Sequence, residues 1–313
     1  MKTLLYDLRF ALRQLRKTPG MAVLAVLTLA LGVGANTAIF TVIESVLLRP
    51  LRYANSDRLI FIGPQSDKPG FGTTSWLNFR DIHDQSRLLE NSAGFSEDVS
   101  VLETPEGSLS IAAPRVTPSL FSVLGVRPIL GRTFSVAEGL TGGPDVVVLS
   151  EKLWRDTFHS NPNIVGQSVR IGGKFRTVVG VMPSTFRFPE SFGSLIEKGV
   201  WLPVQPTPEM LKDRGYHFFM IVAELRPGVT IEQAQRELDA IAAHIPRKSD
   251  ESKITFQASS YQELLTGPVR PVLYALFSAL ALVLLIACAN VSNMLIARCL
   301  ARQQEFAVRA ALG

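Results

Sequence analysis

The sequence predicts an α+β membrane protein in which two transmembrane helices flank an extracytoplasmic α+β domain. Three observations support this fold class. Two long apolar stretches lie near the ends of the 313-residue chain, the segment between them is rich in strand and turn patterns, and the excess positive charge lies outside both stretches. Only 19% of the residues are charged, below the roughly 25% of a typical soluble domain.

The first elements are a basic amphipathic segment and an apolar span. We expect residues 1–18 to form a cytoplasmic amphipathic helix on the inner membrane surface, with leucines on one face and arginines elsewhere. The first transmembrane helix is expected at 19–48, with 26 uncharged residues between Lys17 and Glu44. A buried core helix and a cleaved signal peptide are the alternatives. Continued hydrophobicity and the lack of a clean cleavage site count against the signal peptide.

Small and polar residues inside the two spans predict helix packing within the membrane. Small residues recur at intervals of four in the first span, a spacing that lets helices approach closely. A polar path for a substrate is the alternative interpretation. The residues expected to pack are Ala30, Gly34, Ala38, Asn36, Asn290 and Asn293. Helical rise places Asn36 and Asn290 at different depths, so we expect their partners to come from further helices or a second subunit.

The segment 49–270 is long enough for a sizeable core and is punctuated by proline and glycine. Helices are expected at 76–88, at 151–158 after Ser150, and at 231–244, where Thr230 and Gln233 form a capping box. Apolar runs predict strands at 59–62, 109–112, 146–149, 169–171, 177–181, 218–225 and 254–257, with a hairpin turn at Gly172-Gly173. Strand–helix–strand patterns over 59–112 and 218–257 flank a strand-rich insertion at about 114–205 and suggest two subdomains.

The second transmembrane helix is expected at 271–297, where 27 residues carry no charge. The flanks of the two spans are basic, with a net charge of +4 over 1–20 and +2 over 298–313, whereas 49–270 has 24 basic and 24 acidic residues. Since basic flanks stay in the cytoplasm, both termini are expected to be cytoplasmic and 49–270 periplasmic or extracellular.

The sequence lacks the motifs that are typical of several functional classes. The neutral central segment argues against nucleic-acid binding. The four histidines are scattered, the two cysteines lie in or just after the second span, and no G-x-x-x-x-G-K-[ST] motif occurs. We therefore expect no catalytic residues, no metal site and no cofactor, and we do not expect an enzyme.

Long blocks in a fixed order carry a family resemblance. They include DLRFALRQLRKTPG followed by LTLALGVGANTAIFTVIESVLLRPL in 7–51, FSVLGVRPILGRTF at 121–134, and LLIACANVSNMLIARCLARQQEFAVRAALG at 284–313. With these blocks the chain resembles the N-terminal part of a MacB/FtsX-type ABC transporter permease, and is most similar to the duplicated orphan permease (ADOP) branch. The resemblance covers nearly the whole chain.

The resemblance implies a MacB-like periplasmic core domain in a permease of the bacterial inner membrane. Its porter-like part would comprise 56–113 and 215–258, with an inserted subdomain at 114–205. The chain would end at the start of an FtsX-like cytoplasmic segment, 298–313, which predicts that it is a fragment. In the family, a separate cytoplasmic ATPase drives the membrane helices and the movement reaches the outer domain (mechanotransmission).

The same resemblance implies export of an amphipathic or lipid-like substrate, with a second permease subunit or repeat and the lipid bilayer as further partners. The residues that would couple to the ATPase are Asp7, Arg9, Arg13, Arg16, Arg302, Glu305 and Arg309. The chain has Arg309-Ala310 where family members often have two arginines. The alternatives are a two-span membrane sensor with an extracytoplasmic ligand-binding domain, and a membrane-anchored structural or adhesion domain.

Overall fold

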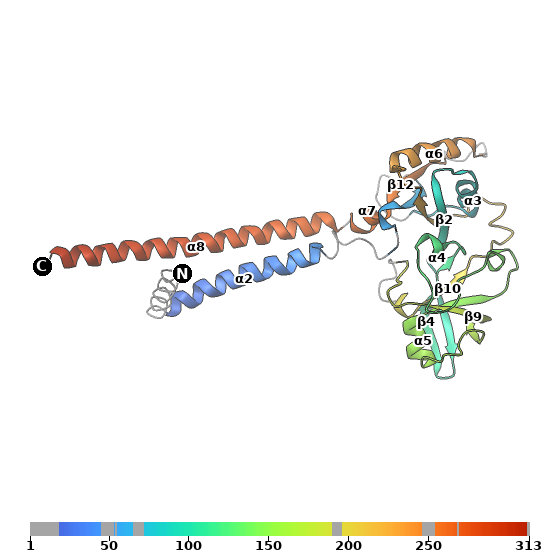
Figure 1. Ribbon diagram of the computed structural model, residues 1–313, viewed down its shortest axis with the longest axis horizontal. Helices are drawn as coiled ribbons and strands as arrows, with labels where there is room; N and C mark the ends of the chain where they lie inside the picture. The colour runs from blue at the N-terminus through green and yellow to red at the C-terminus, as the bar shows by residue number, and fades with distance from the viewer. Residues whose placement is uncertain are drawn as a thin grey trace. The chain divides into compact units, whose positions relative to one another are not determined.

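The computed structural model describes residues 19–44, 53, 55–64, 72–189, 196–245, 254–267 and 269–311. The chain divides into two compact units. The helical unit combines Met1–Arg49 with Thr266–Gly313, and the sheet domain is Pro50–Leu265. Figure 1 shows two long helices in the helical unit and mixed helices and strands in the sheet domain. The predicted fold class, an α+β domain with an apolar helix on each side of it in the sequence, is confirmed.

The helical unit contains α2 (Pro19–Ile43) and α8 (Arg270–Ala311). Within the described residues, both helices are long and apolar enough to cross a membrane. Large apolar side chains on them are exposed, including Leu31 at 74% and Leu285 at 66%. A helix in a soluble core would bury such side chains, so this exposure argues against the alternative of buried core helices. Helix α8 continues without a break beyond residue 297, where the second span was expected to end.

The two long helices pack along a narrow seam. A Cβ atom added to Gly32 of α2 would lie 2.8 Å from the Cδ1 atom of Leu284 on α8. One turn further along α2, Asn36 donates from Nδ2 to the carbonyl of Leu280 at 3.1 Å and to the carbonyl of Gly32 at 2.9 Å. The expectation that Asn36 needs a partner from further helices is therefore wrong. A helical carbonyl keeps one lone pair free for such a bond.

The row of small residues with a spacing of four lies elsewhere on α2. A Cβ atom added to Gly34 would have no described atom within 4 Å, so Gly32, not Gly34, brings the two helices together. Five of the residues expected to pack are exposed in this helix pair, namely Ala30, Gly34, Ala38, Asn290 and Asn293. Their packing against other helices stays a prediction.

A pair of introduced cysteines tests the seam. In Gly32→Cys/Leu284→Cys we expect a disulfide on mild oxidation, because a Cβ atom at position 32 would lie 3.8 Å from the Leu284 Cβ atom, close to the average of about 3.8 Å in disulfides. The native Cys288 and Cys299 are first replaced by serine, and the bond is measured by peptide mass spectrometry. The matched pair Gly34→Cys/Leu284→Cys should stay reduced. Equal oxidation of both pairs would contradict the seam.

The sheet domain follows one path of hydrogen-bonded strands, β12-β1-β11-β2-β5-β10-β7-β9-β8-β3-β4, with β6 paired to β9. We call the strands from β12 to β5 the first half and the remaining strands the second half. The two halves join where β5 and β10 run parallel. In Figure 1, α3 and α6 of the first half lie at the upper end of the domain, and β4, β9 and α5 of the second half lie at the lower end.

The first half consists of two interleaved β-α-β units. Its elements are η2 (Ser56–Arg58), β1 (Leu59–Pro64), α3 (Trp76–Gln85), β2 (Leu89–Ser96), β5 (Arg115–Val116), α4 (Leu120–Val123), β11 (Met220–Leu225), α6 (Ile231–His244), β12 (Phe256–Ser260) and α7 (Tyr261–Thr266). Strand β11 lies between β1 and β2, and β1 lies between β11 and β12. This order is that of a split β-α-β fold.

Strands β1 and β11 of the first half are buried on both faces, as their continuous apolar runs require. One face carries Ile60 and Ile62 and packs on residues of α3 and α6. The other face carries Leu59 and Phe61 and contributes to an aromatic core. The sequence predicted α6 with its bounds and its capping box, and both are confirmed: Thr230 Oγ1 accepts from the amide of Gln233.

The second half is a mixed sheet covered by α5. Its elements are β3 (Val99–Thr104), β4 (Gly107–Ala112), β6 (Leu130–Gly131), η3 (Val136–Gly139), β7 (Val146–Ser150), α5 (Glu151–Phe158), β8 (Ser168–Ile171), β9 (Lys174–Met182) and β10 (Val200–Pro203). The predicted hairpin between β8 and β9 is confirmed, with positive φ angles at Gly172 (58°) and Gly173 (75°). Glycine adopts two such angles in succession without strain.

One grouping of strands differs from the expectation. The strand predicted at 109–112 is the end of β4, and it belongs to the second half, because β4 pairs with β3 and β3 pairs with β8. The strand that completes the first β-α-β unit is instead β2, which was not predicted. Its sequence, LENSAGFS, contains polar residues and a glycine and lacks an apolar strand pattern. The subdomain boundaries themselves stay a prediction.

Candidate functional site

The candidate site is the end of the sheet at which the chain enters and leaves the domain. Strand β1 begins at Leu59 and β12 ends at Ser260, and the two strands are antiparallel neighbours with Ile60 opposite Ser260. The chain therefore arrives from α2 and departs through α7 towards α8 at one end of the same strand pair. A displacement of either connection would act on adjacent strands.

The incoming chain is fastened to β11 by a buried carboxylate. Arg58 of η2 places Nη2 2.6 Å from Oε1 of Glu224, whose side chain is only 11% exposed. Asn55, in the left-handed conformation just before η2, donates from Nδ2 to the same oxygen at 2.8 Å. Arg58 also donates from Nη1 to the carbonyl of Leu225 at 2.8 Å. Three polar contacts thus fix the entry point of the chain.

An aromatic cluster joins both connections to the second half. We call Tyr53, Phe186, Phe188, Trp201 and Tyr261 the aromatic junction. The ring of Tyr53, on the incoming chain, lies 6.4 Å from those of Phe186 and Phe188, and the ring of Tyr261, at the start of α7, lies 6.2 Å from that of Phe188. Trp201 of β10 donates from Nε1 to the carbonyl of Phe188 at 2.8 Å.

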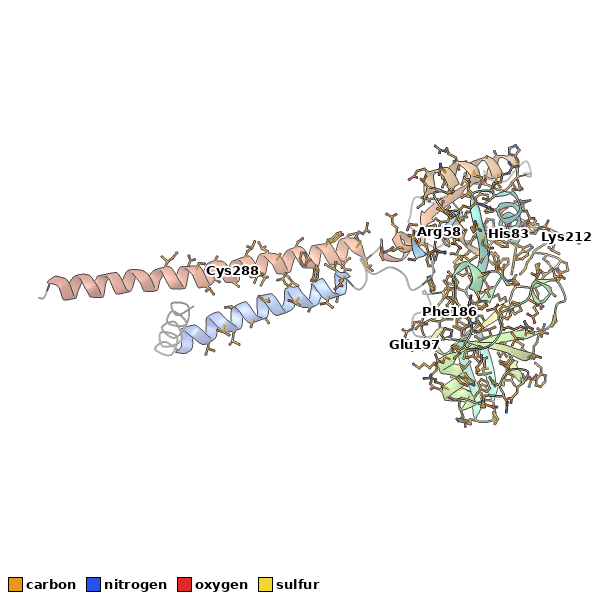
Figure 2. The ribbon with its side chains drawn as sticks, in the orientation of Figure 1. Arg58, His83, Phe186, Glu197, Lys212 and Cys288 are labelled. Atoms are coloured by element: carbon orange, nitrogen blue, oxygen red, sulfur yellow. The ribbon has the colours of Figure 1, made fainter. Side chains whose placement is uncertain are left out.

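The junction is closely packed. Phe188, Trp201 and Tyr261 are fully buried, and Phe186 is 3% exposed. Phe186 and Phe188 follow β9, so they belong to the second half, whereas Tyr53 and Tyr261 adjoin the first half. Figure 2 labels Arg58 in the first half and Phe186 nearer the second half. Because packed aromatic rings resist deformation, the junction couples both connections to both halves of the sheet.

A charge-removing variant tests the polar contacts of the entry point. In Glu224→Gln we expect the free energy of unfolding to fall by about 1–3 kcal/mol, because the partly buried guanidinium of Arg58 loses its charged partner. Urea unfolding followed by tryptophan fluorescence measures the change. The control is Glu90→Gln, since Glu90 is half-exposed and lies 3.8 Å from Arg226; it should cost less than about 1 kcal/mol. Equal losses would contradict a special role for Glu224.

The residues predicted from the sequence to couple to an ATPase lie outside this site. Asp7, Arg9, Arg13 and Arg16 fall outside the described residues. Arg302, Glu305 and Arg309 lie on the last turns of α8. The aromatic junction and the contacts of Glu224 were not predicted. Single aromatic residues far apart in the sequence give no periodic signal that would have marked this region.

A comparison with known families identifies the chain. Residues 22–241 match the family model described as MacB-like periplasmic core domain. The chain belongs to this family. The match extends from α2 through most of the sheet domain, and with the two apolar helices it indicates a membrane protein with a periplasmic segment.

Two curated relatives align with about two thirds of the chain. Both are named macrolide export ATP-binding/permease protein MacB, one from Salmonella paratyphi A (strain ATCC 9150 / SARB42) and one from Salmonella typhi. Each is 26% identical over 211 residues, which are 66% of this chain and 31% of the relative. The chain thus spans about a third of the length of these relatives.

Two solved structures also align with part of the chain. A domain of a putative permease protein from Porphyromonas gingivalis matches with a TM-score of 0.49 and 17% identity, covering 67% of this chain and 93% of that one. The periplasmic region of MacB from Actinobacillus actinomycetemcomitans matches with a TM-score of 0.48 and 14% identity, covering 69% and 94%.

Proposed function

We propose that the chain belongs to the permease of a MacB-type ABC transporter of the bacterial inner membrane. In this proposal α2 and α8 cross the membrane, both termini are cytoplasmic, and 49–270 is periplasmic. A separate cytoplasmic ATPase moves the helices, and the sheet domain responds to the movement during export of an amphipathic or lipid-like substrate. The family match over 22–241 and the basic flanks of both helices support this topology.

The observation that carries the proposal is the shared entry and exit point at β1 and β12. Because Ile60 lies opposite Ser260, a movement of the two membrane helices would reach two adjacent strands together. The aromatic junction would pass this movement to the second half, since Phe188 contacts Tyr53 and Tyr261 and accepts a hydrogen bond from Trp201.

The proposed ATPase contact involves the cytoplasmic residues at both ends of the chain. On the N-terminal side these are Asp7, Arg9, Arg13 and Arg16, and on α8 they are Arg302, Glu305 and Arg309. The sequence has no phosphate-binding G-x-x-x-x-G-K-[ST] motif, so ATP would be bound by a different polypeptide or segment. The name of the two Salmonella relatives combines ATP-binding and permease in one protein.

Site-directed photo-crosslinking tests the proposal. A photoreactive amino acid is placed at Arg9, at Arg302 or, as a control, at Lys174 in the sheet domain. The chain is co-produced in membranes with a MacB-type ATP-binding subunit of the same genome. We expect crosslinks from positions 9 and 302, because both would face the cytoplasm, and none from position 174.

The outcomes separate the alternatives. Absence of crosslinks from both cytoplasmic positions in intact membranes would refute the transporter proposal and favour a two-span sensor. Crosslinks from position 174 would refute the topology. In the same samples, Gly32→Cys/Leu284→Cys shows whether the helix pair is formed, so a failure to capture the ATPase is not confused with misfolding.

A further inference from the structure

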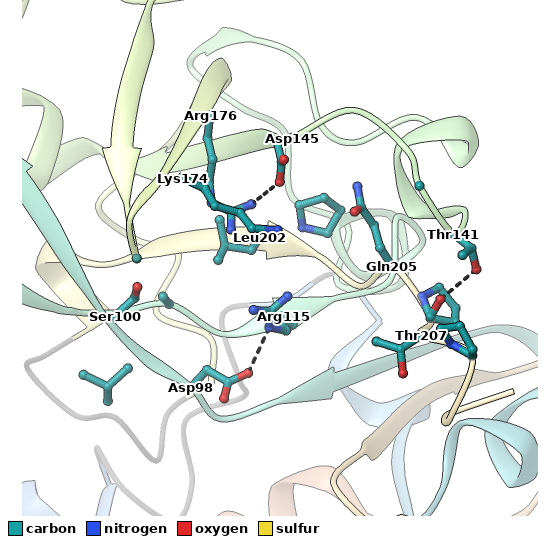
Figure 3. Close-up of a pocket in the computed structure, with 17 residues that line it drawn as sticks. Asp98, Ser100, Arg115, Thr141, Asp145, Lys174, Arg176, Leu202, Gln205 and Thr207 are labelled. Atoms are coloured by element: carbon teal, nitrogen blue, oxygen red, sulfur yellow. Dashed lines mark hydrogen bonds and ion pairs between the residues drawn. The ribbon is translucent and has the colours of Figure 1, made fainter. Parts of the chain in front are cut away.

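Two adjoining cavities lie between the halves of the sheet domain. The first has a volume of about 440 Å³ and is lined by β5, β9, the start of β3 and the chain that follows β10. The second, of about 620 Å³, shares Asp98, Arg115, Gln205 and Thr207 with the first. Because four residues line both, one elongated ligand could occupy the two cavities together. Figure 3 shows the first cavity and the side chains around it.

The first cavity has an excess of positive charge. Its charged lining residues are three cations, Arg115, Lys174 and Arg176, and two carboxylates, Asp98 and Asp145. Arg176 places Nη1 2.8 Å from Oδ1 of Asp145, and Arg115 places Nε 3.5 Å from Oδ2 of Asp98. Figure 3 shows the three cationic side chains around the same space, with these two ion pairs dashed. Lys174 is exposed and forms no ion pair with any described residue.

The positive charge of Arg176 is only partly compensated by its neighbours. The residue is only 8% exposed, and its Nε atom is buried with no hydrogen-bond partner. Burial lowers the pKa of its guanidinium, and the nearby charge of Arg115 lowers it further, against the opposing effect of Asp145. A buried charge of this kind is costly unless it is paired and hydrogen-bonded. An anion in the cavity would offset the repulsion between Arg115 and Arg176.

The second cavity has a more apolar lining. Its lining includes Met210, Tyr216, Phe218 and Met220, and the rings of Tyr216 and Phe218 lie 5.1 Å apart. Tyr216 is 51% exposed, although it is a large aromatic side chain. The exposed Glu97 and the shared Asp98 carry negative charge here, which disfavours a second anionic group. Aromatic and thioether side chains bind apolar chains through their polarisable surfaces.

We propose that the two cavities bind a single anionic amphiphile, with its phosphate or carboxylate head at Arg115, Lys174 and Arg176 and its apolar chain at Tyr216, Phe218 and Met220. The head group is recognised by charge-assisted hydrogen bonds, for which guanidinium groups are well suited. The site refines the proposed function by naming the chemistry of an amphipathic ligand. This inference rests on the proposed function only where it treats the ligand as cargo. Binding of the ligand to the two cavities does not require an ATPase.

Calorimetric titration of the full chain in phosphatidylcholine nanodiscs tests the site. The probes are octyl phosphate, inorganic phosphate and octyltrimethylammonium. We expect octyl phosphate to bind most tightly, inorganic phosphate weakly, and the cation not at all. Lys174→Gln should weaken the binding of octyl phosphate roughly tenfold, because one charge-assisted hydrogen bond is lost. Lys174→Arg should retain binding, and Arg87→Gln, an equal charge change on the surface outside both cavities, should have no effect.

Tyr216→Ser separates the head from the chain. The variant should weaken the binding of octyl phosphate severalfold and leave the affinity for inorganic phosphate unchanged, because position 216 lines only the second of the two cavities. Equal affinity for octyl phosphate and inorganic phosphate would overturn the proposal, as would binding of the cation or insensitivity to Lys174→Gln. Thermal unfolding of each variant shows whether it is folded. Since no ATPase is present, failure here leaves the crosslinking result untouched, and failure of the crosslinking leaves this result untouched.

Discussion

Replacing Phe188 with alanine is expected to lower the free energy of unfolding of the sheet domain by about 3–5 kcal/mol. Phe188 is fully buried and its ring contacts those of Tyr53, Phe95 and Tyr261, with a centroid distance of 4.6 Å to Phe95. Alanine would leave a cavity where the incoming chain, the outgoing chain and the second half meet. The neighbours cannot all close it, because each is held by a different element.

Urea unfolding of the full chain in detergent, followed by tryptophan fluorescence, measures this loss. Trp201 serves as a local reporter because it donates a hydrogen bond to the carbonyl of Phe188. The matched control is Phe175→Ala, since the Phe175 ring is 69% exposed and its removal should change stability by no more than about 0.5 kcal/mol. A loss below about 1 kcal/mol for Phe188→Ala would contradict the close packing of the aromatic junction.

The second large effect is expected at Glu138. Its side chain is 5% exposed, and it accepts hydrogen bonds from Nη1 (2.9 Å) and Nη2 (2.7 Å) of Arg132 and from the amide of Ser135 (2.7 Å). In Glu138→Ala these three hydrogen bonds are lost. We expect the free energy of unfolding at pH 7 to fall by about 2–4 kcal/mol. Glu106→Ala, at an exposed turn, should cost less than about 0.5 kcal/mol.

The same carboxylate makes stability depend on pH. The hydrogen bonds from Arg132, above all, hold the pKa of Glu138 below its usual 4.5, and the amide of Ser184 lowers the pKa of Glu151 in the same direction. A carboxylate with a lowered pKa in the folded state stabilises the fold above about pH 4.5, and this contribution is lost as the pH falls through the folded-state pKa.

We therefore expect the unfolding midpoint to fall as the pH drops below about 4.5 in the native chain, and to fall less steeply in Glu138→Ala, which has already lost this contribution. Urea titrations at pH 7, 5, 4 and 3 measure the difference. Identical pH dependence of the two chains would show that Glu138 is not held in its charged form by the fold. Glu106→Ala should keep the native pH profile.

Local patterns accounted for much of the fold. Helix α6 began and ended where its apolar spacing, its capping box and Pro246 indicated. Ser150 caps α5 as expected, accepting from the amide of Leu153 at 3.3 Å. The predicted helix at 76–88 ends earlier, at Gln85, and the strand predicted from 218 begins at Met220. Helix caps and apolar spacings involve residues that are close together in the chain, so they can be recognised in the sequence.

The candidate sites could not be predicted in this way. The aromatic junction brings together residues from position 53 to position 261, and the cation cluster joins Arg115 of β5 to Lys174 and Arg176 of β9. No spacing rule relates these positions, because they meet only when β10 brings the two halves of the sheet side by side. Strand β2 was missed for a related reason: burial between β11 and β5, and not its own composition, makes it a strand.

The sequence by itself determined which segments are apolar helices, where the charges lie and which family the chain resembles. These properties follow from composition and local order, which need no contacts between distant residues. Only the tertiary structure decided that Gly32 and Asn36 face α8, that β3 and β4 belong to the second half, and that both chain connections meet at one end of β1 and β12. The physical reason is that strand pairing and helix packing depend on which distant surfaces fit together.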